Sequence, residues 1–426
     1  MATLLSRRTF LKSAGALGVL GASSSLFPSW MPRMAFAQSQ AHVRGDVLVV
    51  IFLRGGMDGL SAVVPYGDGR HYYDARPTLA IPEPGAAGGA LDLDGYFGFH
   101  PSMAPLTGIY QSGQLAVVHA TGLTNATRSH FDAMQYMEYG TPDNKSTGTG
   151  WVGRHLETTA GANDSPFRAI GMGAIVQDSL RGTISPLSLR SIADFHLRGR
   201  EGELRHAQDA LARLYRVEAP PDDLGAQARM VFSTVDMLQQ ISAQGYTPAN
   251  GAVYPEDDEG FGLGLRQVAQ LIKADVGLEV ACLDLGGWDT HENEGTRDGF
   301  FEAHLDVLAR GLGAFHTDLQ DAISGVTLVT MSEFGRRVAE NASAGTDHGH
   351  GNFMLVMGGG AHGGQVYANW PTLAPEALND GDLAITTDYR DVLAEVLTNR
   401  LNNSAIDQVF PGLNPLPPGI VRARGL

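Results

Sequence analysis

The sequence of 426 residues is poor in cysteine and in basic residues. Its single cysteine, Cys282, permits no internal disulfide. The 30 Lys and Arg residues are outnumbered by 46 Asp and Glu, which gives a formal net charge of −16, and the sequence has no block of five or more basic residues. Since phosphate backbones and anionic membrane surfaces attract basic proteins, we expect no nucleic-acid partner.

Long hydrophobic runs are also missing. The apolar stretch at 13–27 is interrupted by Gly and Ser and is shorter than the roughly 20 apolar residues of a membrane-spanning helix. It lies between the pair Arg7-Arg8 and the small-residue site Ala35-Phe36-Ala37, an arrangement typical of a secretory signal. The paired arginines before Phe-Leu-Lys resemble a twin-arginine signal, so we expect the twin-arginine export machinery as a partner. We therefore predict that residues 1–37 are a signal peptide, and that the mature protein is periplasmic or secreted without a stable membrane span; the alternative is an uncleaved signal that anchors the chain.

Three sequence motifs of common enzyme classes are absent. The sequence has no Gly-x-Ser-x-Gly, which argues against an α/β-hydrolase, and no Gly-x-x-x-x-Gly-Lys-Ser/Thr, which argues against a P-loop nucleotide hydrolase. The glycines at 260–264 do not fit the dinucleotide-binding pattern and follow no predicted strand.

Strands and helices are predicted to alternate along most of the chain, which is typical of a mostly parallel sheet flanked by helices in an α/β fold. Apolar runs predict strands at 47–52, 115–119, 278–285, 326–331 and 353–357. Helical patterns occur at 100–112, 129–139, 262–274, 299–323 and 388–401. We expect a single domain at 38–426, with a helical insertion at about 180–255.

Acidic and imidazole side chains gather beside the predicted strands. Asp58, Asp289 with His291, and Glu333 each come after a strand, whereas a further group precedes the strand at 353–357 and consists of Asp347, His348 and His350. Because ligands bind outside the carboxyl ends of parallel strands, we expect the first three groups to converge and the fourth to fold over them. Carboxylates with neutral imidazoles form a donor set that Zn²⁺ or Mn²⁺ accepts, so the sequence predicts one or two divalent metals.

Each of the first three groups also has a purely structural interpretation. Asp58 between glycines is a common turn residue, and Asp289 is suited to capping a helix. Glu333 is suited to an ion pair with Arg336.

A candidate nucleophile lies between the strand at 115–119 and the helix that follows it. The Ser129 hydroxyl would meet the unpaired N–H groups of a helix N-terminus, which suit a phosphate or sulfate oxyanion. Arg128 and His130 are candidates for substrate binding, and Arg128 can pair with an anion in bidentate fashion. Ser129 is equally suited to a structural role as the N-cap of the helix.

Several motifs together resemble one family of secreted bacterial proteins, domain of unknown function 1501. The resemblance spans the mature chain and rests on these segments: Phe52–Gly59, Phe99–Pro101, Ser129–Phe131, Gly287–His291, Ser332–Arg336 and Asp347–Gly349. That family is placed in the alkaline phosphatase-like, or sulfatase-like, superfamily.

The resemblance implies an alkaline phosphatase-like fold and a set of roles. Asp58 would be an early metal ligand and Ser129 the nucleophile, Asp289 and His291 would form one metal group, and His348 or His350 would supply a late imidazole. The chain departs from the superfamily pattern at 332–333, where it has Ser-Glu instead of Asp-His. It also lacks the Cys-x-Pro-x-Arg signature of standard sulfatases.

Three functions are compatible with these observations. The first is an exported metal-dependent hydrolase that acts through Ser129 on a small-molecule or glycan ester of phosphate or sulfate. The alternative is a non-catalytic secreted protein that uses the same fold to bind a glycan or a protein. A redox protein is supported only by the predicted export route.

Overall fold

The structure is a computed structural model, and it describes residues 46–424 except 160–162, 164, 174, 185, 193–233, 236, 239–240, 242–244 and 297. The chain separates into two compact units, and the larger comprises Ser39–Ser191 and Tyr246–Leu426. The smaller unit, Met1–Gln38 with Ile192–Gly245, lies almost wholly outside the described residues. The predicted signal peptide and most of the predicted helical insertion therefore lie outside them as well.

A nine-stranded sheet forms the centre of the larger unit. Eight strands follow the order β11-β5-β10-β9-β1-β8-β6-β7, and β12 pairs with β5. Their bounds are β1 Val47–Leu53, β5 Leu115–Gly122, β6 Ala169–Met172, β7 Leu187–Leu189, β8 Val280–Leu285, β9 Val326–Met331, β10 Asn352–Gly358, β11 Val366–Tyr367 and β12 Thr387–Asp388. The five predicted strands are all present.

The sheet is mostly parallel, as the alternation of elements predicts. Strand β1 lies at its centre and pairs in parallel with β8 and β9, and every residue of β1 is buried. Only β10 runs against its two neighbours, β9 and β5. Because β10 is reversed, it starts at the sheet edge where β1, β8 and β9 end. The loop before β10 therefore lies at the same edge as the loops that follow those three strands.

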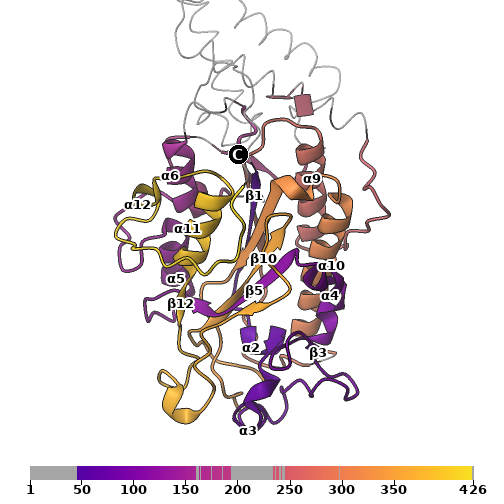
Figure 1. The fold of residues 1–426 in the computed structure, drawn as a ribbon, viewed down its shortest axis with the longest axis vertical. Helices are drawn as coiled ribbons and strands as arrows, with labels where there is room; N and C mark the ends of the chain where they lie inside the picture. Colours follow the sequence, from indigo (N-terminus) through magenta and orange to yellow (C-terminus); the bar gives the residue numbers. More distant parts are fainter. Residues whose placement is uncertain are drawn as a thin grey trace, which may run out of the picture. The chain divides into compact units, whose positions relative to one another are not determined.

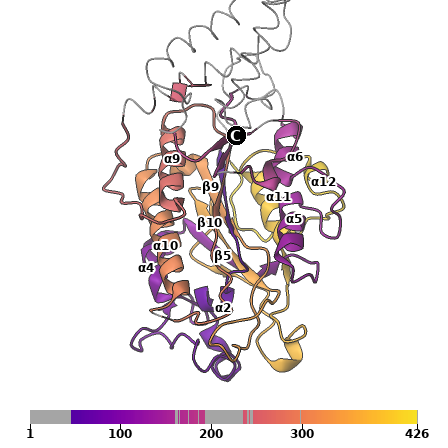
Figure 2. The ribbon, with the colours of Figure 1, turned by 180° about the vertical axis from the view of Figure 1, so that it is seen from behind.

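Helices cover both faces of the sheet (Figures 1 and 2). One face carries α5 His130–Tyr139, α6 Trp151–Thr158, α11 Tyr389–Asn399 and α12 Ile406–Val409, and the other carries α4 Ala104–Gln111, α9 Phe261–Lys273 and α10 Phe300–Asp318. The predicted helix at 100–112 begins as a 3-10 turn, η3 Pro101–Met103, and α10 ends five residues before the predicted end. A mixed α/β fold with helices on both faces is thus confirmed.

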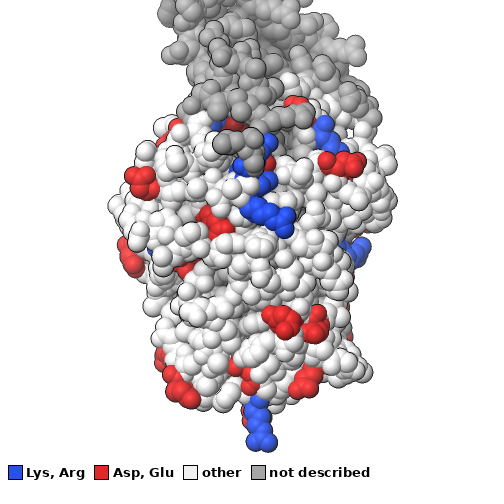
Figure 3. Space-filling model, viewed as in Figure 1, with Lys and Arg blue, Asp and Glu red and all other residues white. Residues whose placement is uncertain are grey.

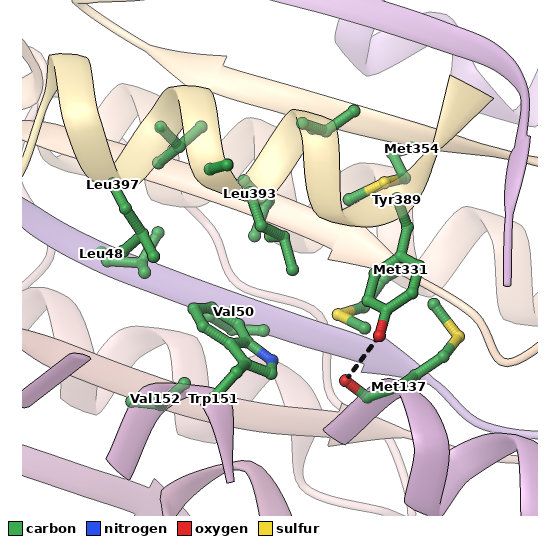
Figure 4. Close-up of a cluster of buried hydrophobic side chains, with 14 of the residues drawn as sticks. Leu48, Val50, Met137, Trp151, Val152, Met331, Met354, Tyr389, Leu393 and Leu397 are labelled. Carbon is green, nitrogen blue, oxygen red and sulfur yellow. Dashed lines mark hydrogen bonds between the residues drawn. The ribbon is translucent and has the colours of Figure 1, made fainter. Parts of the chain in front are cut away.

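The first of these faces holds a large apolar core (Figure 4). Trp151 from α6, Tyr389 and Leu393 from α11, and Val50 from β1 point toward one another and are buried. The Tyr389 hydroxyl also donates to the carbonyl oxygen of Met137 at 3.3 Å, which joins α11 to α5. Packing of this kind fixes the position of α5 relative to α11 and the sheet.

Short elements surround the carboxyl end of β1. They are α2 Gly59–Ala62, β2 Val63–Val64, η2 Tyr66–Asp68, α3 Arg70–Tyr73, β3 Leu91–Asp92 and β4 Gly98–Phe99. Strands β2, β4 and β3 form a small antiparallel sheet. The remaining short turns are η4 Asp178–Leu180, η5 Ile323–Gly325 and η6 Pro375–Ala377.

The excess of acidic residues is visible on the surface, and the scarcity of long apolar runs is reflected in the helices. On the face shown in Figure 3, acidic side chains are spread over the described part of the surface, and basic side chains are few. Among the helices of the described residues, none is both long enough and apolar enough to span a membrane.

Candidate metal centre

Three imidazoles and one carboxylate converge at the carboxyl edge of the sheet. The Nε2 atom of His348 lies 3.0 Å from Nε2 of His130, 2.9 Å from Nε2 of His291 and 3.1 Å from Oδ1 of Asp289. Asp289 also lies 3.0 Å from Nε2 of His291 through Oδ1 and 3.4 Å from Nε2 of His130 through Oδ2. The donor atoms of His130, Asp289 and His348 therefore all lie within 4.8 Å of one another, and His291 adjoins them through His348 and Asp289.

The opposite ring nitrogen of each histidine has its own acceptor. Nδ1 of His130 lies 2.7 Å from Oε1 of the buried Glu333, and Nδ1 of His291 lies 3.1 Å from Oδ1 of Asp347. Nδ1 of His348 lies 3.0 Å from the carbonyl oxygen of Arg128. Acceptors of this kind hold the ring hydrogen on Nδ1, which is how metal-binding histidines are oriented in proteins.

With the hydrogens on Nδ1, the three Nε2 atoms present lone pairs to one another and to a carboxylate. Such an arrangement is repulsive unless a cation or protons lie among the donors. Neutral imidazole nitrogens with a carboxylate oxygen are ligands that Zn²⁺ accepts and that other first-row divalent metals share. The donor set thus fits a divalent metal.

Each ligand is positioned by a different part of the fold. His130 is the first residue of α5, whereas Asp289 and His291 lie in the loop after β8, and His348 lies in the loop before β10. The loop after β1 packs beneath Asp289: a Cβ on Gly55, whose φ is +122°, would lie 2.7 Å from the Asp289 amide nitrogen. Glycine at 55 is required both by this backbone conformation and by the close approach.

Arg336 joins these loops from below and is itself fully buried. Its guanidinium donates to Oδ1 of Asp289 at 2.7 Å, to the carbonyl oxygen of Trp288 at 3.0 Å and to that of Thr346 at 2.8 Å. It also donates to the carbonyl oxygens of Gly55 and Gly56. One side chain therefore fixes the β1 loop, the β8 loop and the loop that carries His348.

The charges around the cluster shift several pKa values. Partial burial raises the pKa of Asp289, but the neighbouring Arg336 guanidinium and His348 imidazole outweigh this effect and lower the pKa to about 2. The hydrogen bond with Glu333 raises the pKa of His130, whereas burial lowers that of His348. Asp289 is therefore an anion at neutral pH, as a metal ligand must be.

Asp347 and Glu333 lie in the second layer of the cluster. Asp347 holds His291, and this hydrogen bond lowers the pKa of the carboxyl. Glu333 accepts from His130, from the Gly55 amide at 2.8 Å and from the Ser332 hydroxyl at 3.1 Å. Both carboxylates face Nδ1 atoms, away from the converging Nε2 atoms.

Asp58 and His350 have other surroundings. The buried Asp58 pairs with the guanidinium of Arg76, accepts from the Ser61 hydroxyl at 2.6 Å and caps α2 through the Leu60 amide at 3.2 Å. His350 is buried, and its Nε2 has no hydrogen-bond partner among the described residues. The structure thus brings His130, Asp289, His291 and His348 together and places Asp58 and His350 elsewhere.

Ser129 and Arg128 immediately precede the cluster. Ser129 is the N-cap of α5, and its hydroxyl accepts from the Asp132 amide at the long distance of 3.5 Å. The Arg128 guanidinium lies 2.5 Å from Oδ2 of Asp382. Both residues are joined to the cluster through the chain, since they directly precede His130.

The sequence predicts a substrate-binding role for His130 and does not place it among the metal ligands, and it gives no sign that Arg76 is buried. It predicts an ion pair of Arg336 with Glu333, whereas the structure pairs Arg336 with Asp289. The signal in the sequence was the clustering of Ser129-His130 with an upstream strand. Burial of an arginine depends on tertiary contacts and has no such signal.

The fold and site define a mixed α/β protein with a possible His/Asp metal centre at the carboxyl edge of its sheet. The chain belongs to the DUF1501 family, proteins of unknown function, whose model matches residues 46–403. A comparison with curated protein sequences found no match.

Several solved structures are similar in fold at low identity. A protein in the alkaline phosphatase superfamily from Vibrio parahaemolyticus is 11% identical, with 80% of this chain and 68% of that chain covered and a TM-score of 0.35. The lipoteichoic acid synthase of Listeria monocytogenes is 10% identical, with 84% and 79% covered and a TM-score of 0.34. The C-terminal periplasmic domain of EcEptC from Escherichia coli, in complex with Zn, is 11% identical, with 76% of each chain covered and a TM-score of 0.32.

Proposed function

We propose that the protein is an exported metal-dependent hydrolase of a phosphate or sulfate ester. The observation that carries this proposal is the convergence of three Nε2 atoms and a carboxylate at one point, with each Nδ1 held by an acceptor. The mature chain would act in the periplasm or outside the cell, as the twin-arginine sequence suggests.

One divalent metal, zinc or manganese, would be held by His130, Asp289, His291 and His348. Bound there, it would supply a positive charge that polarises the ester and neutralises the transferred group. We propose one metal rather than two because Asp58 is neutralised by Arg76, and Glu333 is directed at Nδ1 of His130. The donors that remain free meet at a single point.

Ser129 is the proposed nucleophile. Its hydroxyl lies at the N-terminus of α5, where unpaired N–H groups and the helix dipole favour an anionic group. Attack of Ser129 Oγ on phosphorus or sulfur would form the new O–P or O–S bond, release the alcohol of the ester, and leave a covalent seryl ester for water to hydrolyse. The long contact to the Asp132 amide leaves this hydroxyl weakly engaged as a cap.

Metal analysis tests the site directly. Elemental analysis of the mature protein, purified without affinity metals and then reconstituted, should give about one zinc or manganese per chain. A variant with Asp289→Ala and His291→Ala should retain none. Two metals per chain would contradict the single-centre proposal, and no metal after reconstitution would contradict the metal site itself.

Turnover of a broad panel of phosphate and sulfate esters tests the chemistry. Ser129→Ala should abolish turnover while the metal content stays unchanged, because Ser129 is proposed to react rather than to bind the metal. Unchanged turnover in Ser129→Ala would remove this residue from the mechanism.

A non-catalytic binding protein is the second candidate, and two contacts favour it. Ser129 serves as a helix cap, and the Arg128 guanidinium is paired with Asp382. Capture of a specific glycan or exported protein, together with no ester turnover above the Ser129→Ala background, would favour this function.

A further inference from the structure

Two arginines and two aspartates meet beside the metal centre. The Arg128 guanidinium lies 2.5 Å from Oδ2 of Asp382 and 3.6 Å from Oδ2 of Asp380. The Arg337 guanidinium lies 4.0 Å from each of the same two carboxylates. Asp380 thus places its carboxylate between two guanidinium groups.

Both arginines are attached directly to the metal-binding loops. The carbonyl oxygen of Arg128 holds Nδ1 of His348, and the Arg337 amide donates to the carbonyl oxygen of Asp347 at 2.9 Å. The charge of Arg337 also contributes to the lowered pKa of Asp347, after the larger effects of its hydrogen bonds. Backbone contacts therefore join both arginines to the loops that carry the proposed metal ligands.

Asp380 reaches the arginines from the tip of a tight turn. Asn379 and Asp382 exchange two backbone hydrogen bonds of 2.9 and 3.1 Å, and the two residues between them have φ values of +54° for Asp380 and +85° for Gly381. This is a two-residue hairpin turn, and it packs against Arg337, whose guanidinium donates to the Asp380 carbonyl oxygen at 2.8 Å. Among the described residues, the carboxylate of Asp380 is held only by its ion pairs with Arg128 and Arg337.

The carboxylates of Asp380 and Asp382 differ in how easily they can move away from the two arginines. Asp382 is fully buried, whereas the Asp380 side chain is 81% exposed. An exposed ion pair contributes only about 0–1 kcal/mol, so Asp380 can turn into solvent at little cost. Arg128 also has a buried Nε without a hydrogen-bond partner among the described residues. Once Asp380 has left, two guanidinium groups face one remaining carboxylate, which gives a net positive site with a free donor.

We propose that Arg128 and Arg337 form an anion subsite for a tetrahedral oxyanion, phosphate or sulfate, and that Asp380 occupies this subsite until the anion displaces it. The inference deepens the proposed function, on which it rests, by adding Arg337 and Asp380 to the residues that select an anionic substrate. Arg337 would bind the anion, and Asp380 would compete with it.

Calorimetric titration of the full mature chain with inorganic phosphate, and separately with inorganic sulfate, tests the subsite in zinc-loaded and in metal-free protein. Asp380→Asn should tighten anion binding up to about fivefold, because it removes an exposed competing charge. Arg337→Gln should weaken binding about tenfold or more, and Arg337→Lys should lie between Arg337→Gln and the wild type. Comparison of the two anions shows which oxyanion the subsite prefers.

Matched controls come from Asp306 and Arg310, an exposed ion pair on α10. Substitutions there change the net charge of the protein by the same amounts as those at Asp380 and Arg337, but away from this loop. Asp306→Asn and Arg310→Gln should leave anion affinity unchanged. The subsite does not exist if Asp380→Asn and Asp306→Asn have the same effect on anion affinity. It does not exist either if the anion binds only to the zinc-loaded protein and Arg337→Gln leaves its affinity unchanged. If zinc fails to bind but the metal-free chain shows the Asp380 and Arg337 effects, the hydrolase proposal fails and the subsite stands.

Discussion

Two groups of buried and half-buried charges lie at the carboxyl edge of the sheet, and they balance their charges differently. Around Asp58 the chain supplies its own cation, since Arg76 is fully buried and pairs with this carboxylate. Around Asp289 the buried Arg336 likewise pairs with the carboxylate, but the Nε2 atoms of three imidazoles also gather beside it. The first group is complete with its side chains, whereas the imidazole lone pairs of the second group call for a cation from outside.

Glu294 extends the Asp58 group toward the metal centre. Its Oε2 accepts from the hydroxyls of Thr290 at 3.0 Å and Thr346 at 2.8 Å, which lie on the two ligand-bearing loops. Burial, together with the nearby Asp58 charge, raises the pKa of Glu294 to about 8. A protonated Glu294 needs no further cation, which again marks this group as structural.

Removing the internal cation should have the largest effect. We expect Arg76→Met to lower the free energy of unfolding by about 3–5 kcal/mol, because it leaves the buried Asp58 carboxylate without a partner. Denaturant unfolding of the metal-free protein measures this loss.

Arg70→Met is the control, since Arg70 is exposed on the neighbouring turn of α3. It should change stability by less than about 0.5 kcal/mol. Equal effects of the two substitutions would show that the Asp58 pair contributes little.

Removing one proposed ligand of the cluster around Asp289 should weaken metal binding instead of lowering stability. We expect His348→Ala to weaken zinc binding by about a hundredfold or more, since one of four ligands supplies a few kcal/mol of a total on the order of 10–16 kcal/mol. Competition with a chromogenic chelator measures the affinity.

His350→Ala is the matched variant, because His350 is two residues away and its Nε2 has no hydrogen-bond partner among the described residues. It should keep the affinity of the wild type. A loss of zinc in His350→Ala with retention in His348→Ala would assign the late imidazole to the other residue.

The residues that hold the imidazoles should have intermediate effects. Glu333→Gln is expected to weaken zinc binding by about 10–100-fold, because it removes the buried charge that orients His130. Asp347→Asn should have a smaller effect, since the Asp347 side chain is 57% exposed and solvent screens its contact with His291. The reverse order, measured by the same chelator competition, would contradict the role of burial.

The last prediction concerns the pH dependence of stability, which builds up gradually over several pH units. Glu294 binds its proton more tightly in the folded than in the unfolded chain, where the pKa is about 4.5, so stability should be fully present below that pH and fall as the pH rises toward about 8. Glu294→Gln should remove this fall, which amounts to at most about 3 kcal/mol at pH 7 because each pH unit above 4.5 contributes about 1.4 kcal/mol. Unfolding curves at pH 5, 6, 7 and 8 for both proteins measure the difference; parallel curves would show that Glu294 is ionised in the folded state.

Much of the framework could be predicted from the sequence. The apolar runs that became β1, β8 and β9 are continuous and buried, which is the pattern of strands covered on both faces. The placement of Asp289, His291 and His348 beside strands then followed from the rule that sites lie at one edge of a parallel sheet. Alternation of strands and helices, however, does not reveal that β10 is antiparallel.

Hydrophobic periodicity specifies which segments form strands and which polar residues follow them, because it is a local property of the chain. How those polar side chains are used depends on the folded arrangement. Reversal of β10 brings the loop with His348 to the metal edge, the start of α5 adds His130, and the buried guanidinium of Arg76 takes up Asp58. Pairing direction and burial of charge depend on contacts between residues far apart in the chain, and no local pattern encodes them.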